Sequence, residues 1–121
     1  MNIKKLEQAG LILAQIESNE VLIFDVQSAL DLMATVRYET DADSMILPKA
    51  ALSEQFFVLS SRLAGDILQK FVNYQFRVAI VGDFSGYTSK PLRDFIYESN
   101  QGKHVFFAST VEEAVEQLTR A

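Results

Sequence analysis

The chain of 121 residues contains no cysteine and only one histidine. Without cysteine there is no disulfide, no thiolate metal site and no cysteine nucleophile. His104 has no second histidine beside it, so a metal site or a nucleophile triad built on it would need carboxylates alone as partners. We therefore expect no cofactor and no metal centre, and the lack of disulfide chemistry favours a cytoplasmic protein.

The sequence also lacks a cluster of basic residues and a long apolar run. Eleven lysines and arginines stand against sixteen acidic residues, which gives a formal net charge of -5. Such a chain lacks the positive surface to which nucleic acids and anionic membranes bind. The N-terminal segment 1–18 is interrupted by Glu7 and Gln8 and is too short and polar for a signal peptide or a membrane span. We expect no nucleic-acid partner and no membrane.

Apolar side chains, in contrast, are abundant. Hydrophobic residues make up 49% of the chain and nine residues are phenylalanine, which is enough to bury one core without disulfides. No internal repeat, low-complexity segment or long linker divides the sequence. The sequence therefore predicts a single domain over residues 1–121.

The N-terminal quarter has the pattern of short strands. Residues 3–7 and 11–15 lie on either side of Ala9-Gly10, which predicts a hairpin or two short separate strands. The apolar residues at 21–24 predict a further strand.

The period changes to a helical one after residue 24. Apolar residues then recur every three or four positions, which predicts a helix over 25–39 capped by its first residue, followed by a strand over 44–47. The longest apolar stripe covers residues 53–74 and predicts a long helix that Ser53 caps. Gly65 costs about 1 kcal/mol relative to alanine inside a helix, so it marks either close packing or a break into two helices.

The second half alternates strands and helices. Residues 76–83 predict a strand in which 78–81 form a continuous apolar run, as expected of a central parallel strand buried on both faces. A helix over 91–100 and a strand over 104–108 follow, and Thr110 with Glu113 forms a capping box for a last helix. This order predicts an α/β fold with a largely parallel or mixed sheet of four to five strands, right-handed crossovers and about four helices.

The loop VGDFSGYTSKP, residues 81–91, raises the question of a phosphate site. The spacing of Gly82, Gly86 and Lys90 does not match that of a phosphate-binding loop. The loop nevertheless follows a central strand and leads into a helix, which is where open α/β sheets bind ligands. The candidate ligand-binding or partner-binding residues are Ser53, Asp83, Ser85, Ser89, Lys90, Arg93, Glu98 and Asn100.

Three segments together resemble one protein family. LAGDILQK (63–70), NYQFRVAIVGDF (73–84) and LRDFIYESNQG (92–102) resemble a small bacterial family of uncharacterised proteins, the domain-of-unknown-function family numbered four-one-eight-zero. The resemblance covers about half of the chain and implies no known activity.

The order of the expected elements from residue 25 onward is also similar to that of STAS domains, the fold of bacterial anti-sigma-factor antagonists. This resemblance implies a serine or threonine at a helix start that a partner kinase phosphorylates, and a docking surface at that helix end. By position the nearest counterpart is Ser53. The sequence departs from the STAS pattern because it lacks an Asp-Ser-x-Gly-like turn and has PKAAL (48–52) before Ser53.

Three interpretations of function remain open. The absence of catalytic groups favours a non-catalytic regulatory or protein-interaction module of STAS-like fold, bound by a regulatory protein partner. The alternative is a small-molecule-binding or enzymatic domain with a pocket at the loop 82–90. A third interpretation is that the polar residues hydrogen-bond one another and only hold the loop. Many phenylalanines and an open sheet edge also favour a homodimer.

Overall fold

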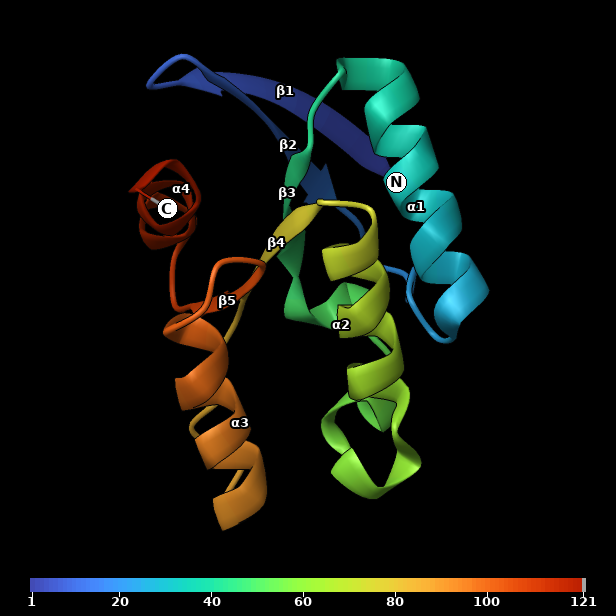
Figure 1. Cartoon of the computed structure of the whole chain (residues 1–121), viewed down its shortest axis with the longest axis vertical. Helices are drawn as coiled ribbons and strands as arrows, with labels where there is room; N and C mark the ends of the chain where they lie inside the picture. The colour runs from blue at the N-terminus through green and yellow to red at the C-terminus, as the bar shows by residue number, and fades with distance from the viewer. Residues whose placement is uncertain (121) are drawn as a thin grey trace.

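A five-stranded mixed sheet forms the centre of the protein in a computed structural model that describes residues 1–120 (Figure 1). The strands are β1 (Asn2–Gln8), β2 (Leu11–Glu17), β3 (Ser44–Pro48), β4 (Arg77–Val81) and β5 (Val105–Ala108). They lie side by side in chain order, with β1 antiparallel to β2 and all the other neighbours parallel. The sheet and its mixed character confirm the sequence prediction.

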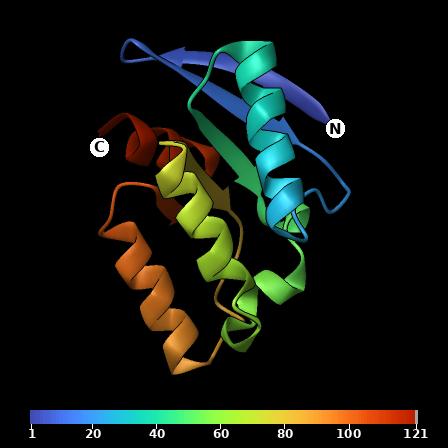
Figure 2. The ribbon, with the colours of Figure 1, turned by 45° about the vertical axis from the view of Figure 1, so that its right-hand side comes forward.

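Four α-helices cover the sheet unequally. They are α1 (Val26–Thr40), α2 (Leu63–Asn73), α3 (Lys90–Asn100) and α4 (Val111–Arg120). Figure 2 shows α1, α2 and α3 in front of the sheet and α4 behind it. The protein is thus a single small α/β domain with three helices on one face and one helix on the other.

The central strands are buried on both faces. Met45 and Leu47 of β3 pack into the core beneath the three helices, whereas Ile46 between them packs into the smaller core with α4. The same alternation holds in β4, where Val78 faces the large core and Ala79 faces the small one. Because both faces are covered, these strands appear in the sequence as continuous apolar runs.

The β1–β2 hairpin forms around the predicted turn. Ala9 and Gly10 both have positive φ angles, 54° and 78°, as a two-residue turn of type I′ requires. The turn pairs Gln8 with Leu11 and so fixes the register of the whole hairpin. The strand predicted at 21–24 is wrong, because this segment makes only an isolated bridge, between Ile23 and Leu52.

The start of α1 is capped as predicted, and of the capping box predicted for α4 the bond to the Thr110 side chain is present. The backbone N–H of Ser28 donates to Asp25 Oδ1 over 2.7 Å, and the N–H of Asp25 donates to the Ser28 hydroxyl over 3.1 Å. At the start of α4 the N–H of Glu113 donates to Thr110 Oγ1 over 3.1 Å. Each cap satisfies an N–H group that the first turn leaves unpaired.

The long helix predicted over 53–74 is wrong in its first half. Residues 49–61 contain three short 3₁₀ helices, η1 (Lys49–Ala51), η2 (Glu54–Phe57) and η3 (Leu59–Ser61). Arg62 then takes a left-handed conformation with φ of 64°, which ends the 3₁₀ segment before α2 begins. Gly65 neither breaks the helix nor allows close packing, because a Cβ at this position would meet nothing within 4 Å.

Candidate functional site

The carboxyl ends of β3 and β4 form the base of the candidate site. The last residues of the two strands, Pro48 and Val81, are paired, so Lys49 and Gly82 lie next to each other where the strands end. A Cβ at Gly82 would come within 2.6 Å of Lys49 Cβ. Glycine at position 82 is therefore required by the close approach of the two chain segments rather than by a turn.

Lys49 extends over two stacked aromatic rings. Its Nζ lies 4.7 Å from the ring centre of Tyr87 and 5.8 Å from that of Phe57, and the two rings stack 4.9 Å apart. The Tyr87 hydroxyl donates to Glu54 Oε2 over 3.2 Å. Interaction with Tyr87 is the main cause that raises the pKa of Lys49, and the carboxylates of Glu54 and Asp83 raise it further. The ammonium group therefore stays charged over the whole neutral pH range.

Asp83 closes the turn that follows β4. Its Oδ1 accepts hydrogen bonds from both the backbone N–H of Ser85, at 2.9 Å, and the Ser85 hydroxyl, at 2.6 Å. These two bonds, and to a lesser extent Lys49, lower the pKa of Asp83. A phosphate-binding loop would need such a backbone N–H free for its ligand, but here a carboxylate occupies it.

The start of α3 is fixed by local contacts. Ser89 caps the helix through its hydroxyl, which accepts from the N–H of Leu92 over 3.5 Å. Lys90 Nζ pairs with Asp94 Oδ2 over 2.7 Å one turn along the helix, and this contact raises the pKa of Lys90. Lys90 is 85% exposed, so the ion pair adds little to stability.

An open groove runs between the loop 84–88 and α3. It encloses about 550 Å³ and is lined by Phe84, Ser85, Tyr87, Thr88, Arg93, Ile96, Tyr97 and Asn100. Below it the ring of Phe84 packs edge to face on Phe107 of β5, with ring centres 5.2 Å apart. Arg93 is exposed and the Tyr97 side chain is 67% exposed, so both residues can reach a bound molecule.

Asn100 ends the groove but is already bound. Its Oδ1 accepts from the backbone N–H of Phe107 over 2.7 Å, and its Nδ2 donates to the Phe107 carbonyl over 3.3 Å. The side-chain amide thus pairs with β5 in the way that a neighbouring strand would. This contact covers one residue of an otherwise open sheet edge.

The structure brings some of the predicted site residues together and leaves others apart. Ser85, Arg93 and Asn100 line the same groove, and Asp83, Ser89 and Lys90 belong to the loop and the helix start beside it.

Ser53 and Glu98 lie outside the groove. Ser53 caps η2 by accepting from the N–H of Gln55 over 3.2 Å, and therefore does not cap a long helix as the sequence had predicted. Glu98 lies exposed on α3, where it adds slightly to the raised pKa of Lys90.

Sequence reasoning missed the cluster of Lys49, Glu54, Phe57 and Tyr87. A signal for it does exist in the sequence, because parallel neighbouring strands end at the same edge of a sheet. The segment after 44–47 should therefore meet the segment after 76–83.

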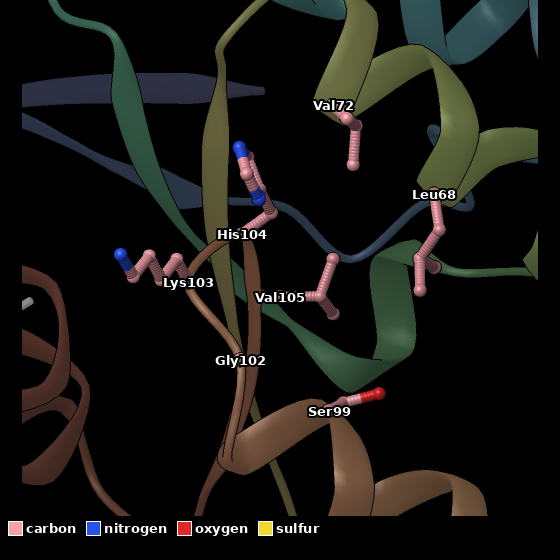
Figure 3. A pocket seen from close by; sticks show the side chains of 7 residues that line it. All are labelled: Leu68, Val72, Ser99, Gly102, Lys103, His104 and Val105. Atoms are coloured by element: carbon pink, nitrogen blue, oxygen red, sulfur yellow. The ribbon is translucent and has the colours of Figure 1, made fainter.

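A second, smaller hollow lies between α2 and the start of β5 (Figure 3). Its volume is about 160 Å³, and its walls include Leu68 and Val72 of α2, Val105 of β5 and the single histidine, His104. Figure 3 shows the two α2 side chains directed toward Val105, whereas Lys103 points away from them. None of the predicted site residues lines this hollow.

Residues 1–120 contain neither a candidate metal cluster nor a helix suited to a membrane. No group of three or more histidine and acidic side chains is arranged to hold a metal ion within this part of the chain. None of the helices in it is both long and apolar enough to cross a lipid bilayer.

Comparison with known proteins identifies one family. The model of the family described as Domain of unknown function (DUF4180) matches residues 8–118. The match covers all strands and helices from β2 onward except the last two residues of α4. Neither a curated protein nor a solved structure matches the chain. The match confirms the resemblance carried by the three sequence segments: the chain belongs to the family Domain of unknown function (DUF4180).

Proposed function

We propose that this chain is a non-catalytic protein-interaction module whose groove between the loop 84–88 and α3 binds a segment of a regulatory partner protein. The bound segment carries a carboxylate that pairs with Arg93 and an apolar side chain that packs on the aromatic rings of the groove. The observation that carries the proposal is the presence of an unpaired cation and exposed aromatic surface in one open groove.

Arg93 supplies the charged contact. Within residues 1–120, no hydrogen bond or ion pair holds its guanidinium group, whereas the neighbouring Lys90 is paired with Asp94. A guanidinium group binds a carboxylate through two parallel hydrogen bonds. An acidic side chain or a chain terminus of the partner is therefore the chemistry that Arg93 selects.

The apolar contacts come from three residues beside Arg93. Tyr97 and Ile96 follow it on α3, and Tyr87 lies in the facing loop. Tyrosine and arginine are enriched at the energetic centres of protein interfaces because they combine large contact area with hydrogen bonding. The groove is open to solvent along its length. An open groove suits an extended segment of another chain better than a reaction that must exclude water.

We also propose that the module has a STAS-like fold, and the order of its elements supports this. The elements α1, β3, α2, β4, α3, β5 and α4 follow the order on which that resemblance rests. Ser53, the nearest counterpart of the phosphorylated residue, precedes Glu54, and Glu54 binds Tyr87 of the groove. Phosphorylation of Ser53 would place a second anion near Tyr87 and Lys49, which gives a route for regulating the groove.

The proposal is tested by site-specific photo-crosslinking in the cell. A photoreactive phenylalanine analogue replaces Tyr97 in the groove, and in a control it replaces Tyr38 of α1, which is 90% exposed. We expect a crosslinked protein that appears only with the probe at 97 and is lost on Arg93→Glu, while Lys103→Glu outside the groove leaves it unchanged. The same adduct with both probes, or one indifferent to Arg93→Glu, would reject the groove as the docking site.

A small-molecule ligand is a second candidate function because the groove volume falls in the range of ligand pockets. A thermal-shift screen with carboxylate-bearing and phosphate-bearing metabolites tests it. A ligand present at one hundred times its dissociation constant adds about 2.7 kcal/mol of stability. A hit that Arg93→Ala abolishes would favour this function, and a screen without hits would leave the protein partner.

A further inference from the structure

The outer edge of β1 is open. β1 is the first strand in the sheet order, so it has a partner on one side only, and Figure 1 shows no other element running along its outer side. Its seven residues, NIKKLEQ, make it one of the two longest strands of the sheet. An edge of this length presents unpaired backbone groups to which a further strand can bind.

The hairpin register determines which residues have these groups. In a type I′ turn the residues before and after the two turn residues are joined by a backbone hydrogen bond, and here these residues are Gln8 and Leu11. Hydrogen-bonded positions alternate along an antiparallel pair. The N–H and C=O groups of Ile3, Lys5 and Glu7 therefore point outward, to the free edge.

A second copy of β1 can pair with this edge only in certain registers. A two-fold axis perpendicular to the sheet leaves equivalent faces of the two sheets on the same side. Odd-numbered residues of one β1 then lie opposite odd-numbered residues of the other, and even-numbered ones opposite even-numbered ones. An axis through Lys4, Lys5 or Glu7 would place two like charges directly opposite, which is destabilising. An axis through Leu6 instead pairs Lys5 with Glu7 of the second copy, and by symmetry Glu7 with its Lys5.

We propose that the protein forms a homodimer in which two β1 strands pair antiparallel about Leu6 and join the two sheets into one of ten strands. The outward groups of Lys5 and Glu7 form the backbone hydrogen bonds, and their side chains form two symmetric cross-strand ion pairs. The two Leu6 side chains meet on the face that carries α4, where Leu6 already packs against the small core. Lys4 lies opposite Gln8, so its charge has no like-charged partner.

This pairing gives the edge lysines a specific role. Lysine on an edge strand normally discourages pairing with other chains. In β1 the same charges would repel each other in pairings centred on Lys4, Lys5 or Glu7, but not in the pairing centred on Leu6. The sequence of β1 therefore admits one symmetric partner and excludes misaligned ones.

A charge-exchange series tests the dimer by sedimentation across a range of protein concentrations. Wild-type protein dimerises, and Lys5→Glu or Glu7→Lys raises the dissociation constant by about tenfold or more, because each change places like charges opposite each other twice. The double variant Lys5→Glu/Glu7→Lys restores dimerisation, while the control Lys4→Glu, opposite Gln8, leaves it nearly unchanged. Wild-type protein that remains monomeric, or a double variant as weak as the single ones, overturns the proposal.

Engineered cysteines test the register separately. Because the natural chain contains no cysteine, Leu6→Cys introduces one thiol per copy. In the proposed register the two Cα atoms at position 6 lie about 4.5 Å apart, which a disulfide can span. Diamide, which takes two hydrogen atoms from the thiol pair, then crosslinks Leu6→Cys but not Lys4→Cys, whose copies lie about 14 Å apart. Crosslinking at position 4 in preference to position 6 contradicts the register.

Discussion

The two ends of the parallel sheet use their cationic side chains in opposite ways. At the amino end, Arg77 of β4 donates from Nε to the Lys103 carbonyl over 3.0 Å and lies against the Phe106 ring. Arg37 of α1 likewise pairs with Asp43 over 2.9 Å at the start of β3. These arginines join neighbouring segments to one another and have little capacity left for a ligand.

At the carboxyl end Lys90 pairs with Asp94, but two other cations are held less completely. Lys49 lies over aromatic rings and makes no ion pair within residues 1–120, and Arg93 extends from α3 into the open groove. Charged groups that form no ion pair within the fold are the ones available to another molecule. The comparison of the two ends therefore supports the proposed binding groove more directly than the number of polar residues in a loop does.

The pKa shifts show the same contrast. Burial lowers the pKa of Arg77, which has carbonyl oxygens rather than carboxylates around it. The pKa of Lys49 is raised by Tyr87 first and by two carboxylates in addition. The amino end thus accommodates a half-buried cation among carbonyl oxygens, whereas the carboxyl end keeps a cation charged at its surface.

The largest effect is expected from filling the space between Lys49 and the strand end. Gly82→Ala would place a methyl group 2.6 Å from Lys49 Cβ, which the rigid start of that side chain cannot avoid without a shift of the backbone. We expect a loss of up to about 3 kcal/mol in the free energy of unfolding, measured by urea denaturation.

Gly86→Ala is the matched control for this change. Gly86 lies in the same loop, but a Cβ there would meet nothing within 4 Å, so we expect a change within about 0.5 kcal/mol. Equal losses in the two variants would show that the carboxyl end does not depend on close contact between Lys49 and residue 82.

A smaller loss of stability is expected from replacing Asn100, which lines the groove but whose side chain is hydrogen-bonded to β5. Asn100→Ala leaves the N–H of Phe107 without its partner, although the Phe107 carbonyl keeps a donor in Gln117. Because Phe107 is buried, the unpaired N–H should cost about 2 kcal/mol in unfolding free energy. Asn73→Ala removes only the exposed contact with Gln69 and should cost far less. Similar losses in both variants would place Asn100 among the residues free for a ligand.

The parts of the fold predicted from sequence are those that local chemistry decides. The turn at Ala9-Gly10, the caps at Asp25 and Thr110 and the buried strand of β4 each depend on a few adjacent residues. The prediction failed over 53–74, where two short 3₁₀ helices and a turn replace the first half of the predicted helix. There the Ser61 hydroxyl donates to the Gln55 carbonyl over 2.7 Å and closes a compact turn before α2.

The sequence predicted where the loop after β4 would lie but not which residues would contact it. The loop after β4 lies at the carboxyl edge of the parallel strands, where open α/β sheets generally bind ligands, and the strand order predicts this position. The contact between Glu54 and Tyr87, however, joins residues 33 positions apart. The pairing of Asn100 with the β5 edge likewise appears only once the helix is docked on the sheet. Such contacts depend on how the elements pack, so no short sequence pattern predicts them.

The smallest effect concerns the pH dependence of the turn at Asp83. Its pKa is lowered from 3.8 in the folded protein, first by the Ser85 hydroxyl and then by the Ser85 N–H. A carboxyl group whose pKa is lower in the folded state stabilises the fold above its unfolded pKa, and this contribution is lost as the pH falls through the folded pKa. The difference in unfolding free energy between wild type and Asp83→Asn should therefore be constant near neutral pH and decrease below pH 3.8. In a Ser85→Ala background, which lacks the hydroxyl donor, the same comparison should show a weaker decrease. A difference that stays constant or grows on acidification would mean that the turn is held by its backbone alone, and that the carboxyl end of the sheet has one more uncommitted charge than the structure indicates.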